Sequence, residues 1–143
     1  MSFLLDTNVV SEWVKRDPDP GVVVWLSAVD EDRVFVSVIT LAELRYGVDR
    51  MDNGARRRRI EQWLRHEMPL RFEGRILSID AAVADSWGKL VALREAAGRR
   101  IEPMDAFIAA TAQVHDLTLV TRNAADFQGS VRAVVDPWSQ ASR

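Results

Sequence analysis

The sequence contains no cysteine among its 143 residues. Disulfide bonds and thiolate-ligated metal sites are therefore excluded, so any metal ion must take oxygen or imidazole ligands. An uninterrupted apolar run of about 18 residues, which a membrane-spanning helix needs, is also missing. The first ten residues, MSFLLDTNVV, carry no basic segment and reach an acid at Asp6, which argues against a signal peptide. We therefore expect a cytoplasmic protein that does not enter a membrane.

Two nucleotide-binding motifs are absent as well. The chain has no Gly-x4-Gly-Lys-Ser/Thr and no Gly-x-Gly-x-x-Gly. Histidine is scarce, and His66 and His115 both lie in segments with helical spacing that offer no matching serine or cysteine nucleophile. His115 stands near a helix end, where an interaction with the helix dipole is the simpler explanation. Histidine-based nucleophilic catalysis is therefore not expected.

Lysine is nearly absent, because Lys15 and Lys89 are the only two among 19 basic residues. The formal net charge is −2, so the chain is not a general binder of polyanions. Arginine suits bidentate contact with phosphate, but a GC-rich genome produces the same bias. The run Arg56–Arg59 covers more than one helix face, so a solvated surface is the favoured interpretation and RNA contact is the alternative.

Short apolar runs alternate with segments of helical spacing along the whole chain. Strands are predicted at residues 3–5, 34–36, 76–79, 117–120 and 131–135, and helices near 9–14, 22–29, 40–51, 54–68, 81–97 and 103–115. The length suits one domain, residues 1–143, with a substantial core. This alternation predicts an α/β fold, a three-layer α/β/α sandwich around a mainly parallel sheet.

Four acids stand where predicted strands and helices meet. Asp6 and Asp126 follow strands, while Glu43 and Asp105 open helices. Each has an ordinary structural explanation. Asp6 could cap a helix, Glu43 could complete a capping box with Thr40 as N-cap, Asp105 could complement a helix dipole, and Asp126 could be a turn residue. In an open α/β sheet, however, ligands bind beyond the carboxyl ends of the strands, where all four side chains could reach one cleft.

Carboxylates gathered in one cleft raise each other's pKa values, and a cation removes that cost. Hard oxygen ligands without histidine or cysteine select Mg²⁺ or Mn²⁺. A metal ion held by two or three carboxylates, with several waters retained, can activate water against a phosphodiester. The acids alone therefore lead to the hypothesis of a metal-dependent phosphodiesterase.

Four segments, taken in order along the chain, carry a family resemblance. They are Leu4–Glu12, Ile39–Val48, Pro103–Ala112, and Leu119–Asn123 with Asp126-Phe127. Together they resemble the motifs of PIN-domain nucleases, and within these the VapC-like toxins of type II toxin–antitoxin pairs, with the FitB-type branch nearest. The resemblance implies a Mg²⁺- or Mn²⁺-dependent endoribonuclease that forms a homodimer, or a larger assembly with its antitoxin. It also implies inhibition by a small cognate antitoxin, with DNA contacted only through that partner.

The resemblance assigns roles to individual residues. Asp6 and Asp105 match the acids that hold the metal ion most directly, and Glu43 and Asp126 match acids that support it directly or through water. The polar residues matched to site support are Thr7, Asn8, Thr121 and Asn123. Asp126 stands far enough from the preceding strand to face solvent, in which case Asn123 or Thr121 would fill the fourth position.

Without a histidine pair for acid–base transfer, water rather than a ribose hydroxyl is the expected nucleophile, so cleaved RNA should carry 5′-phosphate and 3′-hydroxyl ends. Two alternatives stay open. A haloacid-dehalogenase-like phosphatase also has an Asp after the first strand, but it needs a second Asp where Asn8 stands. A non-catalytic, partner-binding PIN-like domain would use the acids only as helix caps.

Overall fold

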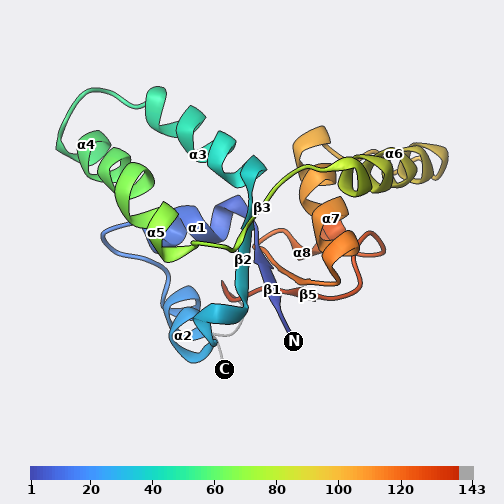
Figure 1. Cartoon of the computed structure of the whole chain (residues 1–143), viewed down its shortest axis with the longest axis horizontal. Helices are drawn as coiled ribbons and strands as arrows, with labels where there is room; N and C mark the ends of the chain where they lie inside the picture. Colours follow the sequence, from blue (N-terminus) through green and yellow to red (C-terminus); the bar gives the residue numbers. More distant parts are fainter. Residues whose placement is uncertain (139–143) are drawn as a thin grey trace.

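The structure, a computed structural model that describes residues 1–138, is built on a sheet in which all four strand pairs are parallel (Figure 1). The strand order is β3-β2-β1-β4-β5. The strands are β1 (Phe3–Leu5), β2 (Val34–Ser37), β3 (Ile76–Leu77), β4 (Thr118–Val120) and β5 (Val134–Val135). The predicted α/β fold with a mainly parallel sheet is confirmed.

Strand β1 lies at the centre of the sheet and marks a reversal of the strand order. The chain adds β2 and β3 on one side of β1 and then returns to add β4 and β5 on the other. At such a reversal the connections leave in opposite directions, which opens a crevice at the carboxyl ends of the two strands. Asp6 directly follows β1 and Thr121 directly follows β4, so both residues lie at this point.

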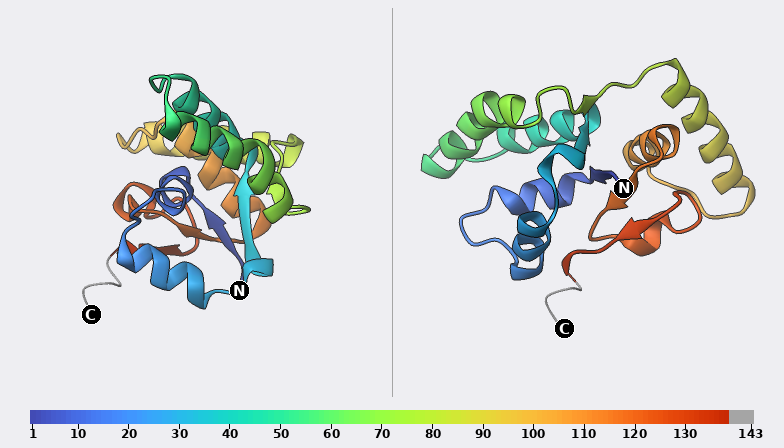
Figure 2. Two further views of the ribbon diagram at one scale, coloured as in Figure 1. Left: turned by 90° about the vertical axis from the view of Figure 1, so that its left-hand side faces the viewer. Right: turned by 60° about the horizontal axis from the view of Figure 1, so that its bottom comes forward.

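Helices cover both faces of the sheet (Figure 2). One face packs against α1 (Thr7–Trp13), α2 (Pro20–Ala28), α3 (Val38–Asp49), α4 (Ala55–Gln62), a π-helical turn (Trp63–Glu67) and α5 (Met68–Arg71). The other face packs against α6 (Ala81–Ala96), α7 (Pro103–His115) and α8 (Ala124–Phe127). A 3-10 turn, Glu31–Arg33, precedes β2. Within residues 1–138, none of these helices has the length and apolar character needed to cross a membrane.

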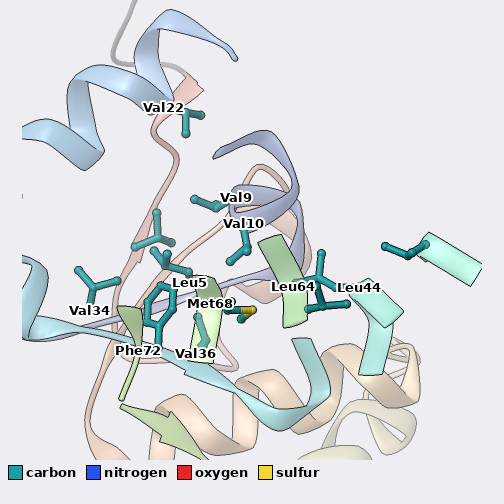
Figure 3. Close-up of a cluster of buried hydrophobic side chains, with 12 residues drawn as sticks. Leu5, Val9, Val10, Val22, Val34, Val36, Leu44, Leu64, Met68 and Phe72 are labelled. Atoms are coloured by element: carbon teal, nitrogen blue, oxygen red, sulfur yellow. The ribbon is translucent and has the colours of Figure 1, made fainter. Parts of the chain in front are cut away.

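Side chains of the central strands alternate between two buried clusters. Leu5 and Val36 belong to the cluster beneath α1–α5, whereas Leu4 and Leu119 belong to the cluster beneath α6–α8. Figure 3 shows the first cluster, in which Phe72 lies against side chains from the sheet. Because successive strand residues point to opposite faces and both faces are covered, the strands appear in the sequence as unbroken apolar runs.

The start of α3 differs from the prediction. Ser37, the last residue of β2, is the N-cap, and its hydroxyl accepts the N–H of Ile39 at 3.0 Å. Thr40 lies buried inside the first turn, so the predicted capping box of Thr40 and Glu43 is wrong. The strand runs straight into the helix, which therefore begins earlier and carries Glu43 in its second turn.

Three other boundaries also differ. The helical segment after Gly54 was predicted to end at Pro69, but it continues to Arg71. Pro69 has no N–H for the carbonyl of Arg65, and a π-helical turn, with the Met68 N–H bonded to the Trp63 carbonyl, accommodates it. The predicted strands at 76–79 and 131–135 shorten to two residues each, because each is an edge strand with one neighbour.

Replacing Phe72 by alanine should lower the free energy of unfolding by about 3–5 kcal/mol, since the side chain is fully buried and its removal leaves a cavity. Urea unfolding measures the change. Leu70→Ala is the matched control, because Leu70 is 75% exposed two residues away and should change stability by only about 0.5 kcal/mol. Equal losses in the two variants would contradict the packing described here.

Candidate functional site

The carboxylate of Asp6 lies buried at the carboxyl end of β1, with the residue 5% exposed. Its Oδ1 accepts the backbone N–H of Thr7 at 2.8 Å, so Asp6 caps α1. Its Oδ2 accepts the hydroxyl of Thr121 at 2.8 Å, and the amide of Asn8 lies 3.4 Å away. Burial raises the pKa of Asp6, while the hydrogen bonds from Thr121 and Thr7 lower it. These donors fix the orientation of a carboxylate that is almost removed from water.

Glu43 reaches the same place from the second turn of α3. The hydroxyl of Thr7 donates to Glu43 Oε1 at 2.5 Å and lies 3.1 Å from the hydroxyl of Thr40. Thr7 therefore joins the start of α1 to α3. Burial raises the pKa of Glu43, and the Thr7 hydrogen bond lowers it. The negative charges of Asp6 and Glu102 raise that pKa further, which shows that these carboxylates lie within electrostatic reach of one another.

Asp105 enters the site from the first turn of α7. Its backbone N–H donates to Glu102 Oε2 at 3.0 Å, and Pro103 occupies the first turn of the helix, as predicted. Burial, together with the charges of four other acids, raises the pKa of Asp105 to about 6. Those acids are Asp6, Glu102, Glu43 and Asp126. The other three predicted acids thus all act electrostatically on Asp105.

Thr121 is the hub of the polar contacts around Asp6. Besides donating to Asp6, its hydroxyl oxygen accepts the backbone N–H of Asn123 at 3.0 Å and lies 3.3 Å from the amide nitrogen of Asn8. The Asn8 amide oxygen accepts the N–H of Arg122 at 3.3 Å. Of the predicted supporting residues, Thr7, Asn8 and Thr121 contact the acids through side chains, whereas Asn123 takes part through its main chain.

Asp126 lies on the exposed side of the short helix α8, not in a turn. Among residues 1–138, no hydrogen bond or ion pair engages its carboxylate. Its charge nevertheless raises the pKa of Asp105, so it lies close enough to influence that acid. The structure thus puts Asp126 at the rim of the cluster, with Thr121 bonded directly to Asp6 at its centre.

Glu102 is an acid that the sequence analysis missed. It is the N-cap of α7, and its charge raises the pKa values of both Glu43 and Asp105. A signal was available, because Glu102 stands immediately before Pro103, a residue favoured at the first helical position, and three residues before Asp105. A fifth carboxylate therefore faces the cluster from the start of α7.

The chemistry of this donor set fits a hard divalent cation. The charges of the other four acids all raise the pKa of Asp105. Within residues 1–138, no lysine or arginine forms an ion pair with Asp6, Glu43, Asp105 or Asp126. In the same part of the chain, no group of three or more Asp, Glu or His side chains has the geometry to hold a metal ion by itself. Mg²⁺ usually keeps several waters and binds one or two carboxylates directly. A partly hydrated ion is therefore the form that this set of acids would hold.

Comparison with known proteins gives consistent matches. The sequence model described as "PIN domain" matches residues 3–128. Toxin FitB of Neisseria gonorrhoeae is 38% identical over 136 residues, which cover 95% of this chain and 98% of that protein. The VapC ribonuclease Y4jK of Sinorhizobium fredii is 36% identical over 139 residues, covering 97% and 99%. A chain of FitAB bound to an IR36 DNA fragment superposes with a TM-score of 0.88 at 36% identity, covering 95% of each chain.

The raised pKa of Asp105 predicts how stability depends on pH when no metal is bound. The carboxyl group binds its proton more tightly in the folded chain, with a pKa of about 6, than at its ordinary value of 3.8. Stability contributed by the protonated form is therefore lost as pH rises from 3.8 through about 6. In EDTA at about pH 7.5, Asp105→Asn should melt at or above the temperature of the wild-type protein, and this advantage should shrink near pH 4.

The control for this measurement is Asp85→Asn on α6, because Asp85 is an exposed acid that pairs with Lys89 at 3.0 Å, away from the cluster. Its thermal stability should follow the wild-type curve at every pH. A lower melting temperature for Asp105→Asn than for the wild-type protein at neutral pH would show that the Asp105 carboxylate is not repelled by its neighbours.

Proposed function

Because this chain belongs to the PIN-domain family, we propose that it is the toxin of a toxin–antitoxin pair and cleaves RNA by metal-dependent hydrolysis of phosphodiester bonds. One observation carries the proposal. The carboxylates of Asp6, Glu43 and Asp105 converge at the reversal of the strand order and have raised pKa values without a cationic partner among residues 1–138. Two relatives covered over nearly their whole length are named a toxin and a ribonuclease, which supports the proposal.

PIN-domain ribonucleases generally use divalent metal ions, and the proposed ion is Mg²⁺ or Mn²⁺. Asp6 and Asp105 would hold it, with Glu43 and Asp126 reaching it directly or through water. A bound divalent ion supplies Lewis-acid polarisation of the phosphoryl oxygen and lowers the pKa of a coordinated water. Thr121 and the Thr7 N–H orient Asp6, and the cap from Glu102 fixes the start of the helix that carries Asp105.

The attacking water would be ordered by two side chains. Glu43 has one oxygen bonded to the Thr7 hydroxyl, which leaves Oε2 to accept a proton from water. Asp126, which is exposed, would help to order solvent at the site. His66 and His115 are exposed and lie in the π-helical turn and in the last turn of α7, outside the cluster. Hydrolysis by water therefore needs no imidazole and leaves a 5′-phosphate and a 3′-hydroxyl.

RNA from cells that express the protein without its partner should contain new 5′-phosphate ends, and sequencing of 5′-monophosphate RNA detects them. Glu43→Gln should reduce cleavage by on the order of a hundredfold, because it removes charge at the site and leaves the Thr7 contact possible. Asp85→Asn should cleave like the wild-type protein. New ends that carry 2′,3′-cyclic phosphate would overturn the proposed mechanism, and no new ends at all would overturn the activity.

The two alternatives make different demands on the same residues. A haloacid-dehalogenase-like phosphatase needs a carboxylate two residues after Asp6, and Asn8 instead donates its amide toward Asp6 and Thr121. A non-catalytic domain that uses the acids as caps draws support from Asp6 and Glu102, which do cap α1 and α7. Divalent-ion titration by calorimetry separates this alternative from the proposal, because helix caps alone bind no divalent ion.

The proposed partner is an antitoxin that lays an apolar segment into a groove beside the site. A groove of ≈ 900 Å³ runs between α1, α3 and α4 and begins at Glu43. Its apolar lining comes from Val14, Leu44, Val48, Met51 and Ile60, and its basic rim from Lys15, Arg16, Arg56 and Arg59. An apolar segment flanked by acids complements this surface, and a cationic side chain at its end would meet Glu43. On this interpretation, Arg56 and Arg59 of the arginine run contact the partner.

The resemblance also implies an assembly in which the chain forms a homodimer, or a larger complex with the antitoxin, and contacts DNA only through that partner. The similar chain from FitAB bound to DNA supports this arrangement. RNA is cleaved where it is translated, so the proposed compartment is the cytoplasm. We treat residues 1–143 as one PIN domain, since both buried clusters pack on a single sheet.

Gly47→Leu tests the groove directly. Gly47 lies on α3 in the groove lining, and a Cβ atom added there has open space within 4 Å. Leucine should fill space that the partner needs and should not destabilise the helix, because glycine is about 1 kcal/mol worse than alanine in a helix interior. Affinity for the proposed antitoxin should fall about tenfold or more, measured by calorimetry.

Gly88→Leu is the matched control, because Gly88 is an exposed helical glycine on α6, away from the groove, and also has open space around it. It should leave that affinity unchanged. Equal affinities for the Gly47→Leu and Gly88→Leu proteins would contradict binding in this groove.

A further inference from the structure

We propose that Arg94, a residue of α6 outside the carboxylate cluster, is a positioning residue that holds Asp126 in place relative to Asp105. The inference rests on the proposed nuclease function, because it assigns a task to the acid at the rim of that site. Among residues 1–138, Arg94 forms no ion pair with an acid of the cluster. It acts by joining two chain segments, one that leads into α7 and one that carries Asp126.

The first contact is with the loop that leads to Asp105. Helix α6 ends at Ala96, Gly98 beyond it has a φ of +70°, and the N–H of Arg99 donates back to the carbonyl of Arg94 at 2.8 Å. The side chain of Arg94 adds a second bond, from Nε to the carbonyl of Arg99 at 2.5 Å. Arg99 stands three residues before Glu102, the N-cap of α7. The two bonds therefore fix the position of the loop that joins α6 to α7.

The second contact is with α8. Arg94 Nη1 donates to the carbonyl of Asp126 at 3.1 Å and to the hydroxyl of Ser130 at 2.6 Å. A four-residue helix has no stability of its own, so α8 depends on what it packs against. Phe127 anchors one side of α8 in the core, while the bonds from Arg94 fix the main chain of Asp126 itself. Arg94 bonds only the main chain of Asp126, so it fixes the position of that residue without neutralising its carboxylate.

The anchor at Ser130 is itself fixed. Ser130 is 1% exposed, and its carbonyl accepts a hydrogen bond from Gln113 of α7, whose side-chain oxygen accepts the hydroxyl of Ser86 of α6 at 2.9 Å. Helices α6 and α7 and the segment after α8 are thus joined in one polar network. A displacement of α8 relative to α7 would break several of these bonds together.

An ordinary helix-end role explains only part of this arrangement. An arginine in the last turn of a helix complements the dipole, which accounts for the bond to Arg99. It does not account for the two bonds to the segment after β4. Among residues 1–138, no carboxylate forms an ion pair with Arg94, so its N–H groups are directed to neutral oxygens. The rigid fork of a guanidinium can reach both segments at once, whereas a lysine ammonium cannot.

A double-mutant cycle tests the inference. Wild-type protein, Arg94→Lys, Asp126→Asn and the double variant are compared in cleavage of a defined RNA at saturating Mn²⁺. Arg94→Lys should lower kcat by about tenfold and leave KM for RNA unchanged, because it disturbs an acid and not the RNA surface. In the Asp126→Asn background the same substitution should have almost no further effect. An equal loss of kcat in both backgrounds would overturn the inference, since Arg94 would then act on stability or on another residue.

Hydrogen exchange provides a measurement that does not depend on activity. In Arg94→Lys, the amide groups of Asp126 and Ser130, which are hydrogen-bonded within this segment, should exchange about tenfold faster, and those of β4 should not change. Unchanged exchange at Asp126 and Ser130 would overturn the inference even if the kinetics differed. If the wild-type protein cleaves no RNA, the proposed function fails, while the exchange result still decides whether Arg94 holds α8.

The control for both measurements is Arg132→Lys. Arg132 is an arginine two residues after Ser130. Its guanidinium pairs with Asp116, with Nη1 2.8 Å and 2.9 Å from the two carboxylate oxygens. Among residues 1–138, its side chain forms no hydrogen bond or ion pair with α8. Its substitution should leave kcat and the exchange of Asp126 and Ser130 at wild-type values, and a loss equal to that of Arg94→Lys would show that any nearby arginine has the same effect.

Discussion

The hydrogen bond from the Thr121 hydroxyl to the buried carboxylate of Asp6 is the contact on which the architecture of the site depends. A carboxylate removed from water is stable only if donors replace the lost hydration. Asp6 obtains one donor from the start of α1 and another from the end of β4, 115 residues away. The bond therefore fixes the two central strands at their carboxyl ends. Every other acid of the site is positioned by an element that packs on those strands.

The helices that carry the other acids share a second constraint, because each brings a negative charge toward one already buried. Burial and this repulsion destabilise the charged forms of Glu43 and Asp105, and their pKa values are therefore raised. Stability must then come from elsewhere, and the structure supplies it through apolar clusters on both faces of the sheet and through neutral polar contacts such as those of Thr7. Local electrostatic strain supported by a well-packed scaffold is the pattern expected of a functional site.

Much of this arrangement could be predicted from the sequence, and the failures have physical causes. Strand β1 could be predicted because both of its faces are buried, which gives an unbroken apolar run in the sequence. Asp6 could be predicted as a site residue because it directly follows that run. The N-cap of α3 was predicted at Thr40 because it matches a capping box with Glu43, but Ser37 is both the last residue of β2 and the N-cap, since the strand runs into the helix without a loop. Glu102 was missed because a capping glutamate looks ordinary until α7 is packed beside α3. Arg94 could not be found, since its acceptors are backbone carbonyls, to which no sequence pattern points.

The strand order determines when the site can form during synthesis of the chain. The central strand is made first, but its neighbour β4 follows more than a hundred residues later, so the sheet closes over a long intervening loop. Asp105, Thr121 and Asp126 all belong to this late portion. A chain still on the ribosome, or one cut short by a broken message, holds Asp6 and Glu43 without their counterparts. The complete carboxylate cluster can form only after the segment that carries Asp126 has been synthesised, so a shorter chain lacks the proposed metal site.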